Sequence, residues 1–174
     1  MEATLAEIDE KGLRNATMEG IAARAEIGKA TLYRRWPSKE ALLYFLADQL
    51  SETYEVLDTG DLRKDLLSVF EPLPRLVYKG PVATLTPTFI AEAARDPQIR
   101  EYVSNLVTER RKGARLALQR AKKRGELRRG VDLDTVLDMM HGALDSRFLM
   151  RGLPITEAHV RKVLDLALEG VLVR

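Results

Sequence analysis

The segment from Thr17 to Lys39, TMEGIAARAEIGKATLYRRWPSK, constrains the fold of this chain more than any other part of the sequence. Thr17 is a good helix N-cap, because its hydroxyl can accept a hydrogen bond from a free amide in the first helical turn. Ile21, Ala22 and Ala25 then form a narrow apolar stripe. That spacing predicts a helix of about two turns with one buried side.

A tight turn at residues 26–28 follows, and a second short helix runs from about Lys29 to Trp36. Leu32 and Trp36 lie one helical turn apart, so this helix also has one buried side. The remaining positions of the second helix are polar or basic: Lys29, Thr31, Tyr33, Arg34 and Arg35. Two short helices joined by a tight turn, the second rich in basic residues, are typical of a helix-turn-helix whose second helix enters the major groove of DNA.

The distribution of charge agrees with this interpretation, although the net charge of the 174-residue chain is only +2. Between Arg24 and Lys39 there are five basic residues and one acid, Glu26, whereas residues 1–23 hold five acids and two bases. The positive charge is therefore concentrated where the motif predicts a surface facing DNA.

Residues 1–47 resemble the DNA-binding domain of the TetR/AcrR family of bacterial transcriptional regulators. The resemblance is strongest in the run TLYRRWPSKEAL and depends on order and spacing as well as on residue type. The residues that carry it are Gly12, Ala16, Thr17, residues 21–25, Ile27, residues 31–33 and residues 37–42. One position departs from the family pattern, since Glu26 stands where the family usually has a turn glycine.

The resemblance implies which residues contact DNA. Lys29 and Ala30, directly after Gly28, are expected to face base edges, where an ammonium can donate to guanine and a methyl group can touch thymine. Arg34 and Arg35 are each expected to reach either a base edge or a phosphate. Phosphate contacts, which set register without reading sequence, are expected from Thr17, Thr31, Tyr33 and Lys39. The alternative for the whole segment is a solvated basic helix face that binds nothing.

The rest of the chain also shows helical periodicity, which predicts an all-α fold of about nine helices. We expect a three-helix DNA-binding domain over residues 1–47, joined to a six-helix regulatory and dimerisation core over residues 48–174. The first helix should end at Gly12, and the fourth should run from Lys39 to about Leu57. Prolines at 72, 74, 81, 87 and 97 predict short, bent helices in that region. Longer helices are expected over 97–123, 133–150 and 157–173.

Composition excludes several classes of protein. The absence of cysteine rules out disulfides and thiolate metal sites and fits a cytoplasmic location. No apolar run approaches the ~20 residues needed to cross a bilayer. His141 and His159 are the only histidines, too few for a metal site, and adjacent Asp145 and Ser146 cannot both serve His141 in a catalytic relay. We therefore expect no enzyme activity, no metal and no cofactor.

The last two helices carry apolar stripes that predict a homodimer. In the family, these two helices pair with their twins to form a four-helix interface. The residues expected there are Val136, Met140, Leu144, Val160, Val163, Leu164, Ala167 and Val171. Additional apolar positions such as Leu166 and Leu172 suggest a second contact surface, and the alternative is that both stripes are core within one chain.

A small-molecule effector is also expected. Helices bent by proline pack less tightly than straight ones, which favours a cavity beside them. Aromatic and soft side chains suited to a largely uncharged ligand are Tyr54, Phe70, Tyr78, Phe89, Tyr102, Met139 and Phe148. The basic cluster at Arg110–Arg115 leaves an anionic ligand as an alternative, and the alternative for each residue is ordinary core packing.

The resemblance, together with these observations, implies a sequence-specific, ligand-responsive transcriptional repressor that binds a palindromic operator as a dimer. The alternative from another class is an α-helical adaptor that keeps the fold but binds a protein partner. A second basic run, with ten basic residues and one acid over residues 110–129, is interpreted as the solvated side of a long helix rather than a second nucleic-acid surface.

Overall fold

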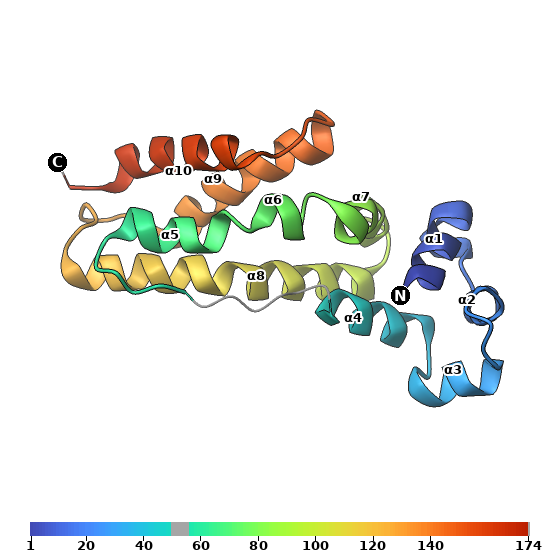
Figure 1. The fold of residues 1–174 in the computed structure, drawn as a ribbon. Coiled ribbons are helices and arrows are strands. Elements are labelled where there is room, and N and C mark those ends of the chain that lie inside the picture. Colours follow the sequence, from blue (N-terminus) through green and yellow to red (C-terminus); the bar gives the residue numbers. More distant parts are fainter. Residues whose placement is uncertain (50–55, 174) are drawn as a thin grey trace. The chain divides into compact units, whose positions relative to one another are not determined.

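The computed structural model describes residues 1–49 and 56–173, and most of these residues are helical (Figure 1). Within these ranges the helices are α1 Glu2–Asn15, α2 Met18–Arg24, α3 Lys29–Arg35, α4 Lys39–Gln49, α5 Leu62–Phe70, α6 Leu73–Leu76, α7 Gly80–Ala93, α8 Pro97–Arg124, α9 Leu133–Asp145, the π-helical η1 Ser146–Met150 and α10 Glu157–Val171. The predicted all-α fold is confirmed.

The contacts divide the chain into two compact units. The first comprises residues 1–52 and 79–105, and so contains α1–α4, α7 and the start of α8. The second comprises residues 53–78 and 106–174, with α5, α6, the rest of α8, α9, η1 and α10. This grouping follows contacts rather than motifs, and the domain boundary expected after residue 47 stays a prediction.

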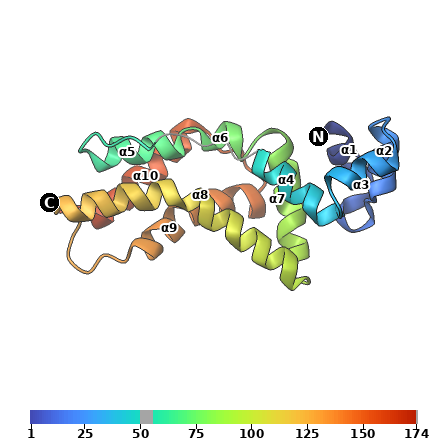
Figure 2. The same ribbon diagram turned by 90° about the horizontal axis from the view of Figure 1, so that it is seen from below.

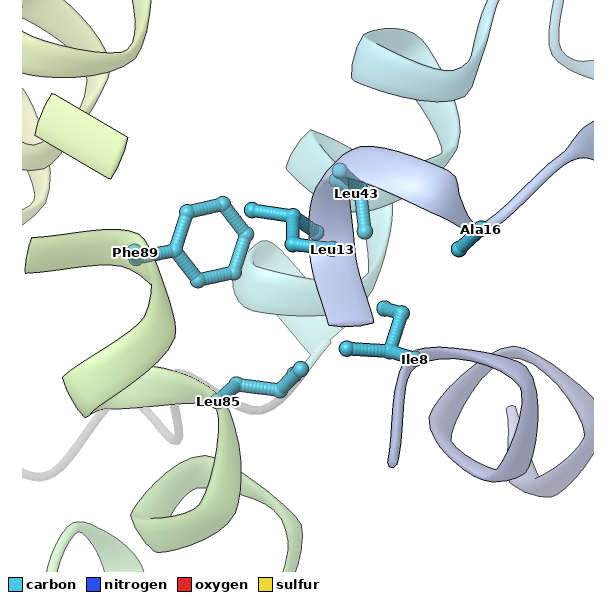
Figure 3. Close-up of a cluster of buried hydrophobic side chains, with 6 residues drawn as sticks. All are labelled: Ile8, Leu13, Ala16, Leu43, Leu85 and Phe89. Atoms are coloured by element: carbon cyan, nitrogen blue, oxygen red, sulfur yellow. The ribbon is translucent and has the colours of Figure 1, made fainter. Parts of the chain in front are cut away.

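In the first unit, α1 bends at Gly12, whose φ of 76° lies in the left-handed region. Glycine adopts this conformation without a steric penalty, and the helix resumes for a last turn up to Asn15, beyond its predicted end. The bend lies beside a buried cluster that joins α1 and α4 to α7 (Figure 3). Its members are Ile8, Leu13, Ala16, Leu43, Leu85 and Phe89.

Proline residues interrupt the middle of the chain largely as the sequence predicts. Pro72 and Pro74 lie around the single turn of α6, and Pro97 opens α8 after Asp96, whose carboxylate accepts a hydrogen bond from the amide of Gln98 at 2.9 Å. Pro87, however, lies inside the 14-residue α7. Its ring removes one backbone donor from that helix without ending it.

In the second unit, α5 and α9 lie beside the C-terminal part of α8 in both views, and α10 packs on α5 and α9 (Figures 1 and 2). The buried side of α8 consists of small residues, with Ala114, Ala117 and Ala121 fully buried. A Cβ at Gly113 would lie 3.0 Å from a methyl group of Val56. Small side chains on α8 therefore allow its neighbours to approach closely.

Two predicted helices differ from the structure at their ends. Residues 56–60 are not helical, so the predicted extension of the fourth helix through Leu57 is wrong, and Leu50 lies outside the described residues. The helix predicted over 133–150 changes to π-helical geometry at Ser146.

Thr156 caps α10 as predicted, accepting a hydrogen bond from the amide of His159 at 3.2 Å. No described helix is both long and apolar enough to cross a membrane.

Candidate nucleic-acid interface

The local structure of α2, the turn and α3 matches the sequence pattern. The Thr17 hydroxyl accepts a hydrogen bond from the amide of Gly20 at 3.0 Å, which confirms its role as the cap of α2. In the turn, Glu26 has a φ of 54°, the left-handed conformation that the glycine at this place in the family would adopt freely. A non-glycine residue there costs about 1–2 kcal/mol, and the turn nevertheless closes through the Ile27 amide, which donates to Ala22 O at 3.1 Å.

One side of α3 is anchored in a small core. Leu32 is buried among Met18, Ile21, Ala22, Leu42 and Leu46, and Trp36 packs against the edge of this cluster. Because a helix of seven residues buries only one side, the remaining positions of α3 are exposed: Lys29, Ala30, Thr31, Tyr33, Arg34 and Arg35. We call these six residues, together with Gly28 before them, the α3 face.

Two residues of the α3 face share one partner on α2. The Lys29 ammonium forms an ion pair with Oε1 of Glu19, and the Tyr33 hydroxyl donates to the same oxygen at 3.3 Å. The hydrogen bond from Lys29 lowers the pKa of Glu19, and the carboxylate in turn raises the pKa of Lys29. Both groups are therefore charged at neutral pH.

The two arginines of the α3 face differ in their surroundings. The Arg35 guanidinium stacks over Trp36, with 4.8 Å between its carbon and the ring centroid, and also lies 5.5 Å from the ring of Phe45. Arg34 is exposed and makes no hydrogen bond or ion pair within the described part of the chain. Arg34 is therefore the guanidinium that can reach DNA without giving up an internal contact.

Lys39 is placed differently from its predicted role at a phosphate. Its ammonium donates to Leu13 O at 2.9 Å and to Arg14 O and Ala16 O at 3.1 Å, at the C-terminal end of α1. A lysine ammonium has three donors, and all three are used here. Lys39 therefore caps the C-terminal end of α1, and its phosphate contact stays a prediction.

Arg24 likewise serves the fold rather than the exposed surface. Its Nε donates to Oε2 of Glu7 at 2.6 Å, and its Nη2 pairs with Glu10, so that α2 is tied to α1. Glu7 is fully buried, also accepts from Lys11 at 2.7 Å, and has its pKa lowered by these hydrogen bonds. This network was not predicted from the sequence. Its one sequence signal is that Glu7, an acid, lies on the buried side of α1.

Comparison with known proteins decides the family. Residues 1–44 match the family model described as bacterial regulatory proteins, tetR family, and residues 56–167 match that of the tetracyclin repressor-like C-terminal domain. The chain belongs to the TetR family. It is accordingly a helix-turn-helix transcriptional regulator that binds DNA, in a family of regulators rather than enzymes.

Individual relatives agree over most of the chain. The HTH-type transcriptional regulator Rv1556 of Mycobacterium tuberculosis is 32% identical over 164 residues, which cover 93% of this chain and 80% of the relative. The DNA-binding transcriptional repressor TetR of Mycobacteroides abscessus is 30% identical over 161 residues, covering 88% and 82%.

Solved structures of the family share the fold. The TetR family transcription regulator SCO0332 is 27% identical, with a TM-score of 0.70 over 98% of this chain and 95% of that one. A transcriptional regulator from Saccharomonospora viridis in complex with choline is 21% identical, with a TM-score of 0.65 over 99% and 95%. At that identity the second likeness shows the fold alone.

The predicted effector residues of this TetR-family chain fall into two groups. Phe89 and Tyr102, with ring centroids 5.7 Å apart, border a cleft of about 180 Å³ in the first unit, beside Leu13 and Leu43. The other group belongs to the second unit. It consists of Phe70, Tyr78, Met139 and Phe148. Tyr54 lies outside the described residues.

Three aromatic residues of the second group lie near polar groups, of which Asp145 is half-buried and His141 is buried. Tyr78 packs edge-on against Phe148 and donates to Oδ1 of Asp145 at 2.7 Å, and burial raises the pKa of Tyr78. Phe70 stacks on buried His141, whose Nε2 has no hydrogen-bond partner among the described residues. Met139, by contrast, is 56% exposed.

Seven of the eight residues predicted for the dimer interface are buried within the second unit itself. They are Val136, Met140, Leu144, Val160, Leu164, Ala167 and Val171. Val163 is half-buried, whereas Leu166 is 60% exposed on another side of α10. The stripes therefore form core within one chain, and exposed or half-buried apolar side chains on α9 and α10 include Met139, Val163 and Leu166.

The basic run over residues 110–129 is partly neutralised by acids of the same unit. Arg111 pairs with Asp138, Arg115 with Asp134, and Arg120 with Asp58. Arg128 instead donates to the carbonyl groups of Leu172 and Glu169. These partners agree with the interpretation of this run as a helix side rather than a nucleic-acid surface.

Proposed function

We propose that this regulator is a ligand-responsive repressor that binds a palindromic operator as a homodimer. The observation that supports operator binding best is the α3 face: Leu32 anchors the helix, while Lys29, Tyr33 and Arg34 are exposed on it. In a helix-turn-helix, the N-terminal residues of the second helix contact base edges. Lys29 is the first residue of α3 and is therefore the proposed base reader, with Ala30 beside it.

Arg34 is proposed to bind phosphate, because it lies near the end of α3 and has no internal partner within the described residues. Tyr33, Thr31 and Thr17 are exposed hydroxyl donors and are proposed to do the same. Phosphate contacts carry affinity for any sequence. Lys39 is left out of this proposed set, because its three donors already bond to carbonyl groups of the same chain.

The test separates the two roles by mutation. Duplexes are selected from a random pool by the wild-type protein, and binding is measured by fluorescence anisotropy between 50 and 200 mM salt. Arg34→Ala should weaken binding to all duplexes and reduce the slope of log K against log salt by about 0.9 per copy. Lys29→Ala should relax base preference at one position in each half-site.

The matched control is Arg129→Ala, which removes an equally exposed arginine from the second unit. It should leave affinity and salt dependence unchanged. If Lys29→Ala keeps the wild-type sequence preference, Lys29 is not a base reader, and if no duplex is selected at all, operator binding is refuted.

Dimerisation is proposed through the apolar surface at Met139, Val163 and Leu166 on α9 and α10. Two copies related by two-fold symmetry present the same patch to each other, so the operator should be a palindrome. The two α3 helices would then lie about 34–36 Å apart, one turn of B-DNA. Sedimentation of the wild-type protein as a monomer at micromolar concentration would refute this part.

A small effector is proposed to shift the equilibrium between states with different DNA affinity, by thermodynamic linkage. The choline complex of the S. viridis regulator supports the proposal that this fold holds a small molecule. Hydrophobic compounds that raise the melting temperature should also release DNA. Tyr102→Phe removes a hydroxyl from the aromatic group of the first unit, and Tyr78→Phe removes one from the group of the second unit. The variant from which the compound no longer releases DNA identifies the aromatic group that binds the compound.

A further inference from the structure

Glu19 connects the two donors of α3 that are proposed to contact DNA. Lys29 and Tyr33 lie one helical turn apart, and both donate to Oε1 of Glu19 on α2. The Lys29 ammonium is also 5.9 Å from the centroid of the Tyr33 ring. One carboxylate thus holds the leading side chain of the α3 face and its neighbour in a single cluster.

The strength of this cluster suits a positioning role. The side chains of Lys29 and Glu19 are 60% and 50% exposed, and exposed ion pairs are weak. DNA can therefore break the pair. Glu19 biases where the ammonium goes but does not block the α3 face.

We propose that Glu19 is a specificity-determining residue, which keeps the Lys29 ammonium on base edges and away from phosphates. This inference rests on the operator binding proposed above. An ammonium has three donors, so Lys29 can keep one bond to Glu19 while it donates to O6 and N7 of a guanine.

On non-operator DNA the balance is different. Without a matching guanine, the ammonium gains only by moving to a phosphate, and this movement breaks its bond to Glu19. The carboxylate is then left without its cation close to the DNA polyanion. Glu19 therefore penalises non-specific binding more than operator binding.

The experiment compares Glu19→Gln with wild type on a selected operator duplex and on a scrambled duplex of the same length. Glu19→Gln should increase affinity for the scrambled duplex. The slope of log K against log salt for binding to that duplex should steepen by about 0.9 per copy. Affinity for the operator should change by less than about twofold. The ratio of operator affinity to scrambled-duplex affinity should therefore fall about fivefold. This is the low end of the roughly 5- to 150-fold discrimination that one base contact supplies. The matched control is Asp9→Asn, which removes an exposed carboxylate from α1 and should leave the ratio unchanged.

A second comparison distinguishes positioning from simple charge. In a Lys29→Ala background there is no ammonium to position, so Glu19→Gln should no longer change the ratio. An unchanged ratio in the single variant overturns the inference, and so does an equal change in both backgrounds. If the wild-type protein selects no duplex, operator binding itself fails, and this inference fails with it.

Discussion

Replacing Gly20 with alanine tests the joint between α1 and α2. In an ordinary helix interior this change stabilises by about 1 kcal/mol, because glycine has the greater conformational entropy to lose. At Gly20, however, a Cβ would lie 2.5 Å from Cδ of Glu7 and closer still to Oε1. Glu7 is fully buried and bonded to Lys11 and Arg24, so its carboxylate cannot move aside without losing these partners.

The clash should outweigh the gain in helix propensity. Overpacking a buried site costs about 1–3 kcal/mol, and subtracting about 1 kcal/mol of propensity leaves a net loss of about 1 kcal/mol. For a chain of this size that loss lowers the melting temperature by roughly 2–4 °C. Urea unfolding followed by circular dichroism measures the free energy directly.

Two comparisons make the result decisive. Gly142→Ala, in the middle of α9 with nothing within 4 Å of the added Cβ, should stabilise by up to about 1 kcal/mol. In a Glu7→Ala background the obstacle is gone, so Gly20→Ala should also stabilise, and the double-mutant coupling should be about 1–3 kcal/mol. The reasoning is refuted if Gly20→Ala alone stabilises as much as Gly142→Ala.

Three other perturbations have distinct expected outcomes. Lys39→Ala should lower the free energy of unfolding by about 1–2 kcal/mol, because the carbonyl groups at the end of α1 lose their donor. The salt slope of DNA binding should stay unchanged. A flatter slope with normal stability would show that Lys39 binds phosphate instead. Leu166→Glu should give a folded monomer in sedimentation, whereas Leu164→Glu, at a fully buried site, should unfold the chain. If the Leu166→Glu protein is still a dimer, the interface lies elsewhere. Burial lowers the pKa of His141 from 6.5 to about 3. Between these two pH values the unfolded state binds a proton that the folded state does not bind. The free energy of unfolding should therefore fall by up to about 1.4 kcal/mol for each unit that the pH is lowered from 6.5 to 3. His141→Phe should remove that share of the pH dependence, and a curve identical to wild type would show that His141 titrates normally.

Local sequence signals predicted local structure well. Thr17 caps α2, Leu32 is the buried anchor of α3, and Thr156 caps α10. Each of these features depends on residues within one or two helical turns. Propensity and capping chemistry act at that range, so the sequence is sufficient to predict them.

Contacts between distant segments could not be predicted in this way. The Glu7–Arg24 bond joins residues 17 positions apart, and the bonds from Lys39 to the carbonyl groups of α1 span 23 to 26 positions. Periodicity also failed to separate core from interface on α10. It identified the apolar stripe of Leu164 correctly, but what covers a stripe depends on neighbouring helices, and here those helices belong to the same chain.

The same limitation affects how strongly this regulator should hold DNA. Counting charges over residues 24–39 gives five cations per copy, or ten in a dimer, and a salt slope of about −9. The structure removes Arg24, held by Glu7 and Glu10, and Lys39, held by carbonyl groups. Of the three cations left on the α3 face, Lys29 is paired with Glu19 and proposed to face bases, so Arg34 and Arg35 remain for phosphates, which gives a slope of about −4 for the dimer. A measured slope near −9 would mean that DNA binding breaks the internal contacts of Arg24 and Lys39, and the first unit would then have to rearrange on DNA.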